Sequence, residues 1–83
     1  MADNIVVVKS QSYGLFYAQS EPGAPPFVTV GAKVKKGDTI GLVEIMKTFN
    51  AVPAEVDGEV VEIHVSNEDQ LEPGQALISI KEG

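Results

Sequence analysis

The chain has 83 residues, which is room for a single domain with a single core. It has no cysteine, so a disulfide framework and a thiolate metal site are both excluded. Its 6 basic residues stand against 12 acidic ones, and the resulting net charge of −6 repels phosphate backbones and argues against nucleic acid as a partner.

The beginning of the chain shows no targeting or membrane signal. The first four residues lack the positive charge that opens a secretory signal, and the apolar run at residues 5–8 is too short for its apolar part. No apolar run in the sequence is long enough to cross a bilayer. We therefore expect no membrane partner, and a cytoplasmic protein or one of a plastid stroma or other organelle matrix.

Short runs of β-branched and aromatic residues recur along the chain, separated by glycine and proline. Such runs predict strands, and no stretch places apolar residues at helical spacing over three turns. The sequence therefore predicts an all-β fold with short strands. The expected strands are residues 5–8, 15–17, 39–43, 60–65 and 76–80.

Turn residues lie between these runs. Lys36-Gly37-Asp38, Asp57-Gly58 and Pro73-Gly74 are turn sequences, because glycine supplies a positive φ and proline presets its own φ. In the last of them, proline suits position i+1 of a type II turn and glycine suits position i+2.

The two halves of the chain resemble each other. Residues 34–40 align with residues 71–77 at a shift of 37 (71 − 34), and residues 10–14 align with residues 54–58 at a shift of 44 (58 − 14). A duplication of this kind predicts two similar short-stranded sheets packed face to face. The segment that joins the halves, residues 44–50, would then be the pivot of the molecule.

The two shifts differ by 7 residues (44 − 37), which indicates an insertion in the first half, between Gly14 and Val34. Residues 18–26 are rich in proline and show no strand pattern. They predict a protruding loop.

The segment that joins the halves, Glu-Ile-Met-Lys-Thr-Phe-Asn, resembles the biotinylation motif of biotin-dependent carboxylases. That motif is usually written Glu-Ala-Met-Lys-Met, and its lysine carries biotin. Glu44, Met46 and Lys47 match it. Ile45 stands where alanine is common and Thr48 where methionine or leucine is common, and either difference would slow modification.

The resemblance covers roughly residues 4–82 and is to biotin carboxyl carrier proteins of acetyl-CoA carboxylase, in the biotinyl/lipoyl attachment domain family. The approach to the lysine, from Val30 to Asp38, is similar to the family's, and so are the turns that follow the lysine. The resemblance implies one biotinyl domain over residues 1–83. It also implies a flattened barrel or sandwich of two quasi-symmetric four-stranded antiparallel sheets, with the biotinyl-lysine on a hairpin turn.

The resemblance implies that the cofactor is biotin, attached covalently to Lys47. Met46, Glu44, Ile45 and Thr48 are then the residues around the attachment point that a biotin protein ligase meets. It also implies a carrier that accepts carboxylate at a biotin carboxylase and delivers it to a carboxyltransferase acting on acetyl-CoA, in fatty acid biosynthesis. Such a carrier is not itself an enzyme, because biotin performs the chemistry.

The insertion is similar to the protruding thumb of carriers from bacterial and plastid acetyl-CoA carboxylases. It follows the family's Gly-x-Phe-Tyr pattern, here residues 14–17. We therefore expect a thumb-like insertion at about residues 18–26, close to the biotin turn and restraining the cofactor.

Two alternatives within the same fold stay open. A lipoyl carrier domain normally has Asp-Lys flanked by small residues, so Met46 favours biotin over lipoate. An interaction module that kept the fold and lost the cofactor is favoured only by Ile45 and Thr48. The start of the sequence, from Met1, favours a free-standing carrier over an excised domain.

The chain offers little else for chemistry. His64 is the only histidine, is expected in a strand, and has no cluster of ligands at metal-binding spacing, so it receives no metal or base role. The sequence shows no Ser-His-Asp arrangement and no phosphate loop. We expect no catalytic apparatus.

Overall fold

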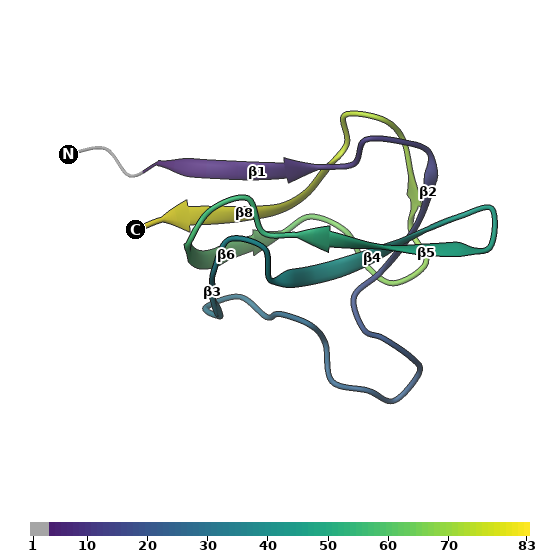
Figure 1. Ribbon diagram of the computed structural model, residues 1–83, viewed down its shortest axis with the longest axis horizontal. Coiled ribbons are helices and arrows are strands. Elements are labelled where there is room, and N and C mark those ends of the chain that lie inside the picture. Colours follow the sequence, from purple (N-terminus) through teal and green to yellow (C-terminus); the bar gives the residue numbers. More distant parts are fainter. Residues whose placement is uncertain (1–3) are drawn as a thin grey trace.

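The chain folds into eight β-strands in two antiparallel sheets, as the computed structural model, which describes residues 4–83, shows (Figure 1). These residues contain no helix that is long and apolar enough to cross a membrane. The predicted all-β fold of two four-stranded sheets is confirmed. The strands are β1 Ile5–Lys9, β2 Gly14–Tyr17, β3 Lys33–Val34, β4 Thr39–Ile45, β5 Thr48–Pro53, β6 Gly58–Ile63, β7 Gln70–Leu71 and β8 Ala76–Glu82.

Each sheet combines strands from both halves of the chain. One sheet has the order β1-β8-β6-β3 and the other has the order β5-β4-β2-β7. Apolar side chains gather in one core, and their removal from water is the main force that holds a fold of this kind together. The core consists of Val8, Phe16, Val34, Ile40, Val43, Val52, Ala54, Val60, Val65, Leu71, Leu77, Ile78 and Ile80.

Three strands lie outside the five that the residue pattern predicts. Strands β3 and β7 have two residues each, which is too short for an apolar pattern to develop. Strand β5 has six residues, but only Val52 among them is buried, so it shows no apolar alternation. Backbone pairing with β4, rather than burial, makes β5 a strand.

The strand predicted at residues 60–65 is wrong at both ends. Strand β6 begins at Gly58 and ends at Ile63, so His64 does not lie in a strand. After Ile63 the chain crosses from the sheet of β6 to the sheet of β7. Val65 is only 7% exposed in this crossing segment, because it belongs to the core. A buried valine in this position fits the sequence pattern of a strand, although the residue lies outside one.

The repeat in the sequence is also present in the backbone pairing. Gly14 of β2 pairs with Leu71 of β7, and Gly58 of β6 pairs with Val34 of β3. The two pairs are related by the same shifts, 44 (58 − 14) and 37 (71 − 34). Each half thus places a short strand in the sheet of the other half, and the two halves interlock.

Two turns of one type lie at equivalent positions of the two halves. In residues 35–38 and 72–75, the last amide donates to the first carbonyl, at 2.9 and 3.1 Å respectively. Gly37 and Gly74 have φ values of 95° and 87°, which a type II turn requires at its third position. The turn predicted at Pro73-Gly74 therefore has the expected geometry.

The β4–β5 hairpin lies at the opposite end of the molecule from the start of β1 and the end of β8 (Figure 1). The molecule is elongated, with extents of 42 × 27 × 19 Å. By the internal repeat, β4 corresponds to β8 and β5 to β1. The hairpin turn therefore takes, in one sheet, the place where the start of β1 and the end of β8 pair in the other.

Candidate functional site

Met46 and Lys47 form a two-residue turn between β4 and β5, in which Ile45 pairs with Thr48. Met46 has a φ of 50° and Lys47 a φ of 66°. A type I′ turn needs positive φ at both central residues, because only then does its twist match that of the paired strands. A residue with a Cβ enters this region at a cost of about 1–2 kcal/mol. The chain therefore holds Lys47 in a stiff, strained turn and not in a loose loop.

Both residues of the turn point away from the body of the protein. The Met46 side chain is 93% exposed, the highest value among the large apolar residues described. Lys47 is also exposed, and within residues 4–83 its amine forms no hydrogen bond or ion pair. A single exposed apolar side chain does not by itself indicate a binding surface, so the family of the chain must decide what Met46 meets. The amine beside it is free to react.

The residues before and after the turn divide between the two faces of the sheet. Val43 is buried and Ile45 packs against the core, so this face is the inner one. Cross-strand partners share a face, which places Thr48, the partner of Ile45, on the inner side as well. Glu44 and its partner Phe49 lie on the outer face. The turn thus separates the predicted site residues instead of gathering them.

On the outer face, Tyr17 contacts both strands of the hairpin. Its hydroxyl donates a hydrogen bond to Oε1 of Glu44 at 2.9 Å. Its ring meets the ring of Phe49 edge-on, with the ring centres 5.5 Å apart and the planes at 62°. The hydrogen bond to Glu44, followed by burial and by the charges of Glu44 and Glu68, raises the pKa of Tyr17 above its ordinary value of 10.0. The phenol therefore remains a donor at neutral pH.

Residues 18–26, the 18–26 loop, leave the sheet after Tyr17 and return as a short ribbon. Gln19 pairs with Pro26, and the amide of Phe27 donates to the carbonyl of Ala18 at 2.8 Å. Asn67 holds the base of the ribbon, because its amide group bonds both to the backbone of Ala18 and to the side chain of Gln19. The loop is therefore an ordered projection.

A groove of about 470 Å³ lies under the 18–26 loop. The loop forms one wall through residues 19–23, and Tyr17, Phe49, Asn67 and Glu68 complete the lining. Phe49 is two residues along the chain from Lys47. The groove thus borders the outer face of the hairpin that carries the free amine.

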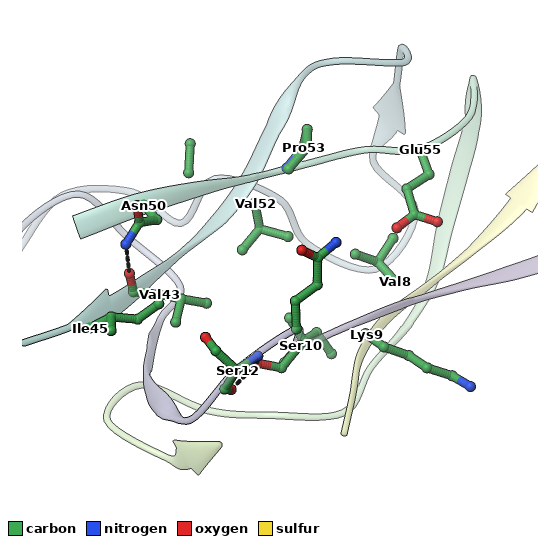
Figure 2. A pocket seen from close by; sticks show the side chains of 13 residues that line it. Val8, Lys9, Ser10, Ser12, Val43, Ile45, Asn50, Val52, Pro53 and Glu55 are labelled. Atoms are coloured by element: carbon green, nitrogen blue, oxygen red, sulfur yellow. Dashed lines mark hydrogen bonds between the residues drawn. The ribbon is translucent and has the colours of Figure 1, made fainter. Parts of the chain in front are cut away.

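A second hollow, of about 310 Å³, lies beside the edge strands β1 and β5 on the inner side of the hairpin (Figure 2). Val43 and Ile45 contribute apolar lining from β4. Asn50 lies at this hollow and donates from Nδ2 to the carbonyl of Val43 at 3.5 Å, as Figure 2 shows, and to that of Thr48 at 3.3 Å. These contacts fix Asn50 as a support of the hairpin.

The structure brings together a serine, a histidine and a carboxylate that no sequence motif predicted as a group. Nε2 of His64 lies 2.7 Å from Oγ of Ser79, and Nδ1 of His64 lies 3.7 Å from Oε2 of Glu62. These three residues do not form a hydrolytic site. Ser79 is only 5% exposed within β8, and the distance between His64 and Glu62 is longer than a hydrogen bond. Within residues 4–83, no group of acidic residues and histidine is placed to hold a metal ion.

Sequence reasoning placed Glu44 in the site but missed two of its companions, Phe49 and Asn67. Tyr17 appeared only as the end of a pattern that precedes the insertion. Tyr17 and Glu44 are 27 residues apart, and Gln19 and Asn67 are 48 apart, so no local pattern links them. The internal repeat was the one signal available, because it indicates which strands become neighbours.

Comparison with known proteins gives a family match over most of the chain. The family model described as "Biotin-requiring enzyme" matches residues 6–80. Among solved structures, the urea carboxylase of Kluyveromyces lactis superimposes with a TM-score of 0.78 and 29% sequence identity, covering 96% of this chain and 6% of that chain.

Curated relatives named biotin carboxyl carrier protein of acetyl-CoA carboxylase match this chain. The protein of Streptococcus pyogenes is 51% identical over 75 residues, covering 90% of this chain and 45% of that protein. The protein of Cyanidium caldarium is 40% identical over 77 residues (93% and 51%), and that of Pseudomonas aeruginosa is 43% identical over 74 residues (89% and 47%). The chain spans about half the length of these relatives.

Proposed function

The chain belongs to the family of biotin-requiring enzymes, and from this premise we propose that it is a biotin carboxyl carrier domain of the acetyl-CoA carboxylase type. Biotin is attached through an amide bond to Nζ of Lys47. The observation that carries the proposal is the family match over residues 6–80, within which Lys47 lies at the tip of an exposed hairpin.

The surroundings of Lys47 fit a covalently attached acyl group. The amine is exposed and forms no ion pair within residues 4–83, so its acylation, which removes the charge, breaks no existing interaction. A free lysine amine has a pKa of about 10.4 and is mostly charged at neutral pH, so the ligase must supply an activated acyl donor. The type I′ turn gives that ligase one defined position of the lysine backbone.

Attached biotin supplies the ureido nitrogen that carries a carboxyl group. The chain supplies the surface that partner enzymes recognise and the tether that brings biotin to them. The stem of Lys47 adds length to the tether, and the hairpin holds the tether away from the two sheets. A tethered group has a high effective concentration at every active site within its reach. The partners are a biotin protein ligase, a biotin carboxylase and a carboxyltransferase acting on acetyl-CoA. The chain is a carrier in fatty acid biosynthesis and not a catalyst.

The residues around Lys47 take different roles in this proposal. Met46 and Glu44, at the tip and on the outer face, contact the ligase. Thr48 is exposed beside the turn, so the presence of threonine in place of the family's methionine or leucine removes no buried side chain from the core. Ile45 packs against the core and so supports the turn from below without obstructing Lys47.

The 18–26 loop acts as a restraint on the attached group. Its groove borders Phe49, which follows Lys47 by two residues, so a group tethered to Lys47 can fold back toward it. The lining combines two aromatic rings, Tyr17 and Phe49, with the polar side chain of Asn67. This combination suits a small ring with both apolar and hydrogen-bonding edges.

The proposal is tested by the intact mass of the chain after incubation with ATP and either biotin and biotin protein ligase, or lipoate and lipoate ligase. One biotinyl increment and no lipoyl increment are expected. A lipoyl increment alone would identify a lipoyl carrier, and no increment from either ligase would identify a module without cofactor. The biotinylated chain should then acquire label from radioactive bicarbonate in the presence of biotin carboxylase and ATP.

A further inference from the structure

The contact of Tyr17 with Glu44 and Phe49 joins three strands at the foot of the lysine turn. Glu44 and Phe49 are direct cross-strand partners on β4 and β5, one pair away from the turn. Tyr17 lies on β2, opposite Leu42, and so reaches Glu44 along a diagonal of the sheet. Diagonal neighbours in a sheet are within reach of aromatic side chains. One residue thereby fixes both strands that lead into the turn.

The internal repeat shows whether this arrangement is a requirement of the fold. In the other sheet, Val61 takes the position of Tyr17 (61 − 44 = 17), Lys81 that of Glu44 (81 − 37 = 44), and Ile5 that of Phe49 (49 − 44 = 5). Strand β6 also has an irregularity in its register between Val60 and Glu62, whereas β2 pairs regularly through Tyr17.

The fold thus accepts an aliphatic residue, a cation and a second aliphatic residue at the same three places. Of the two equivalent arrangements, only the one in the sheet that carries the lysine turn has the phenol, the carboxylate and the aromatic ring. The need for them therefore comes from what happens at the turn and not from the packing of the sheets.

The hydrogen bond leaves part of the Glu44 carboxylate available. Tyr17 occupies Oε1, and among residues 4–83 no donor is bonded to Oε2. A carboxylate held through one oxygen presents the other in a fixed direction, which lowers the entropy lost when a partner binds it. A carboxylate on an exposed strand with no such bond would sample several rotamers.

We propose that Tyr17 is a positioning residue for recognition of this carrier by its biotin ligase. Its hydroxyl orients the Glu44 carboxylate and its ring holds Phe49, so that the outer face of the hairpin meets a donor on the ligase in one arrangement. This inference rests on the proposed function. Tyr17 touches neither the amine nor the acyl donor, so it affects how tightly the chain docks and not how fast the amide bond forms.

The test is the steady-state kinetics of biotin ligase with the wild-type chain and with Tyr17→Phe, which removes only the hydroxyl. Because the variant loses one oriented hydrogen bond, KM for the chain should rise about three- to tenfold while kcat stays within about twofold. Tyr13→Phe is the matched control, because it also removes one phenol hydroxyl, and that hydroxyl forms no hydrogen bond among residues 4–83; its KM should change by less than that of Tyr17→Phe. Thermal melts followed by circular dichroism establish that each variant is folded.

A second comparison separates positioning from a general structural effect. In a Glu44→Gln background, adding Tyr17→Phe should change KM by less than it does in the wild type, because the two groups act as one unit. An unchanged KM for Tyr17→Phe, a loss in kcat instead of KM, or full additivity with Glu44→Gln would overturn the inference while the wild type is still labelled. A wild-type chain that no biotin ligase labels would overturn the proposed function itself.

Discussion

Met46 and Lys47 place backbone strain at the point where the chain presents its amine. A hairpin selected for stability alone would carry Asn-Gly at these two positions, since both tolerate positive φ. Strained residues persist only where the surrounding structure over-determines them. Here the six cross-strand pairs between β4 and β5 do so. The turn is accordingly less stable than an Asn-Gly turn would be, but it holds the lysine in a defined position.

Replacing Lys47 with glycine should stabilise the chain, because glycine adopts positive φ without a clash at Cβ. Allowing for the greater freedom of glycine in the unfolded chain, we expect a gain of about 0.5–1 kcal/mol. For a domain of this size, that gain raises Tm by about 2–8 °C. Thermal melts of Lys47→Gly and of Lys47→Arg, which keeps its Cβ, measure the difference. A lower Tm for Lys47→Gly than for Lys47→Arg would show that the positive φ of Lys47 does not strain the folded chain.

Tyr17 should titrate later than an ordinary tyrosine, because its hydrogen bond to Glu44 raises its pKa above 10.0. Since the pKa is higher in the folded chain than in the unfolded chain, the stability that Tyr17 contributes is complete below about pH 10 and is lost as pH rises through the folded value. In Tyr13→Phe, Tyr17 is the only tyrosine, and absorbance of the phenolate follows it directly.

Adding Glu44→Gln to that variant should move the Tyr17 midpoint to lower pH. A midpoint at or below 10 with Glu44 intact would show that the hydrogen bond does not form in solution.

Among the strands, those with apolar residues in the core could be predicted, and those formed by pairing could not. Strands β4 and β8 each have seven residues and supply much of the core, so their residue pattern is informative. Strand β5 is mostly exposed and follows from the register of the hairpin. The Tyr17 to Glu44 hydrogen bond depends on the register between β2 and β4, which the order of residues along the chain does not contain.

A substitution at Gly58 tests the pairing of β6 with β8. A Cβ at this position would lie 2.1 Å from the carbonyl oxygen of Lys81, and a backbone atom of an interior strand cannot move away easily. Gly58→Ala should therefore destabilise the chain by at least about 2 kcal/mol. Denaturant unfolding measures the loss, with Gly83→Ala as the control because a Cβ there meets nothing within 4 Å. Equal stability of the two variants would contradict the pairing of β6 with β8.

Taken as a whole, the molecule is two similar halves that share their sheets, with the lysine turn at one end and the start of β1 and end of β8 at the other (Figure 1). The sequence was sufficient to predict the repeat, the size of the insertion and the segment between the halves, because glycine turns recur at fixed shifts. It was not sufficient for the groove under the 18–26 loop. That groove depends on Asn67, which is 49 residues from Ala18 along the chain.

The proposed function requires that Lys47 alone carries the biotin. The most direct test is the intact mass of the chain and of Lys47→Arg after incubation with biotin, ATP and biotin protein ligase, followed by fragmentation of the labelled chain to locate the modification. We expect one biotinyl group on the parent, at Lys47, and none on the variant, although the parent has five other lysines. Biotin on Lys47→Arg, or on a different lysine of the parent, would contradict it.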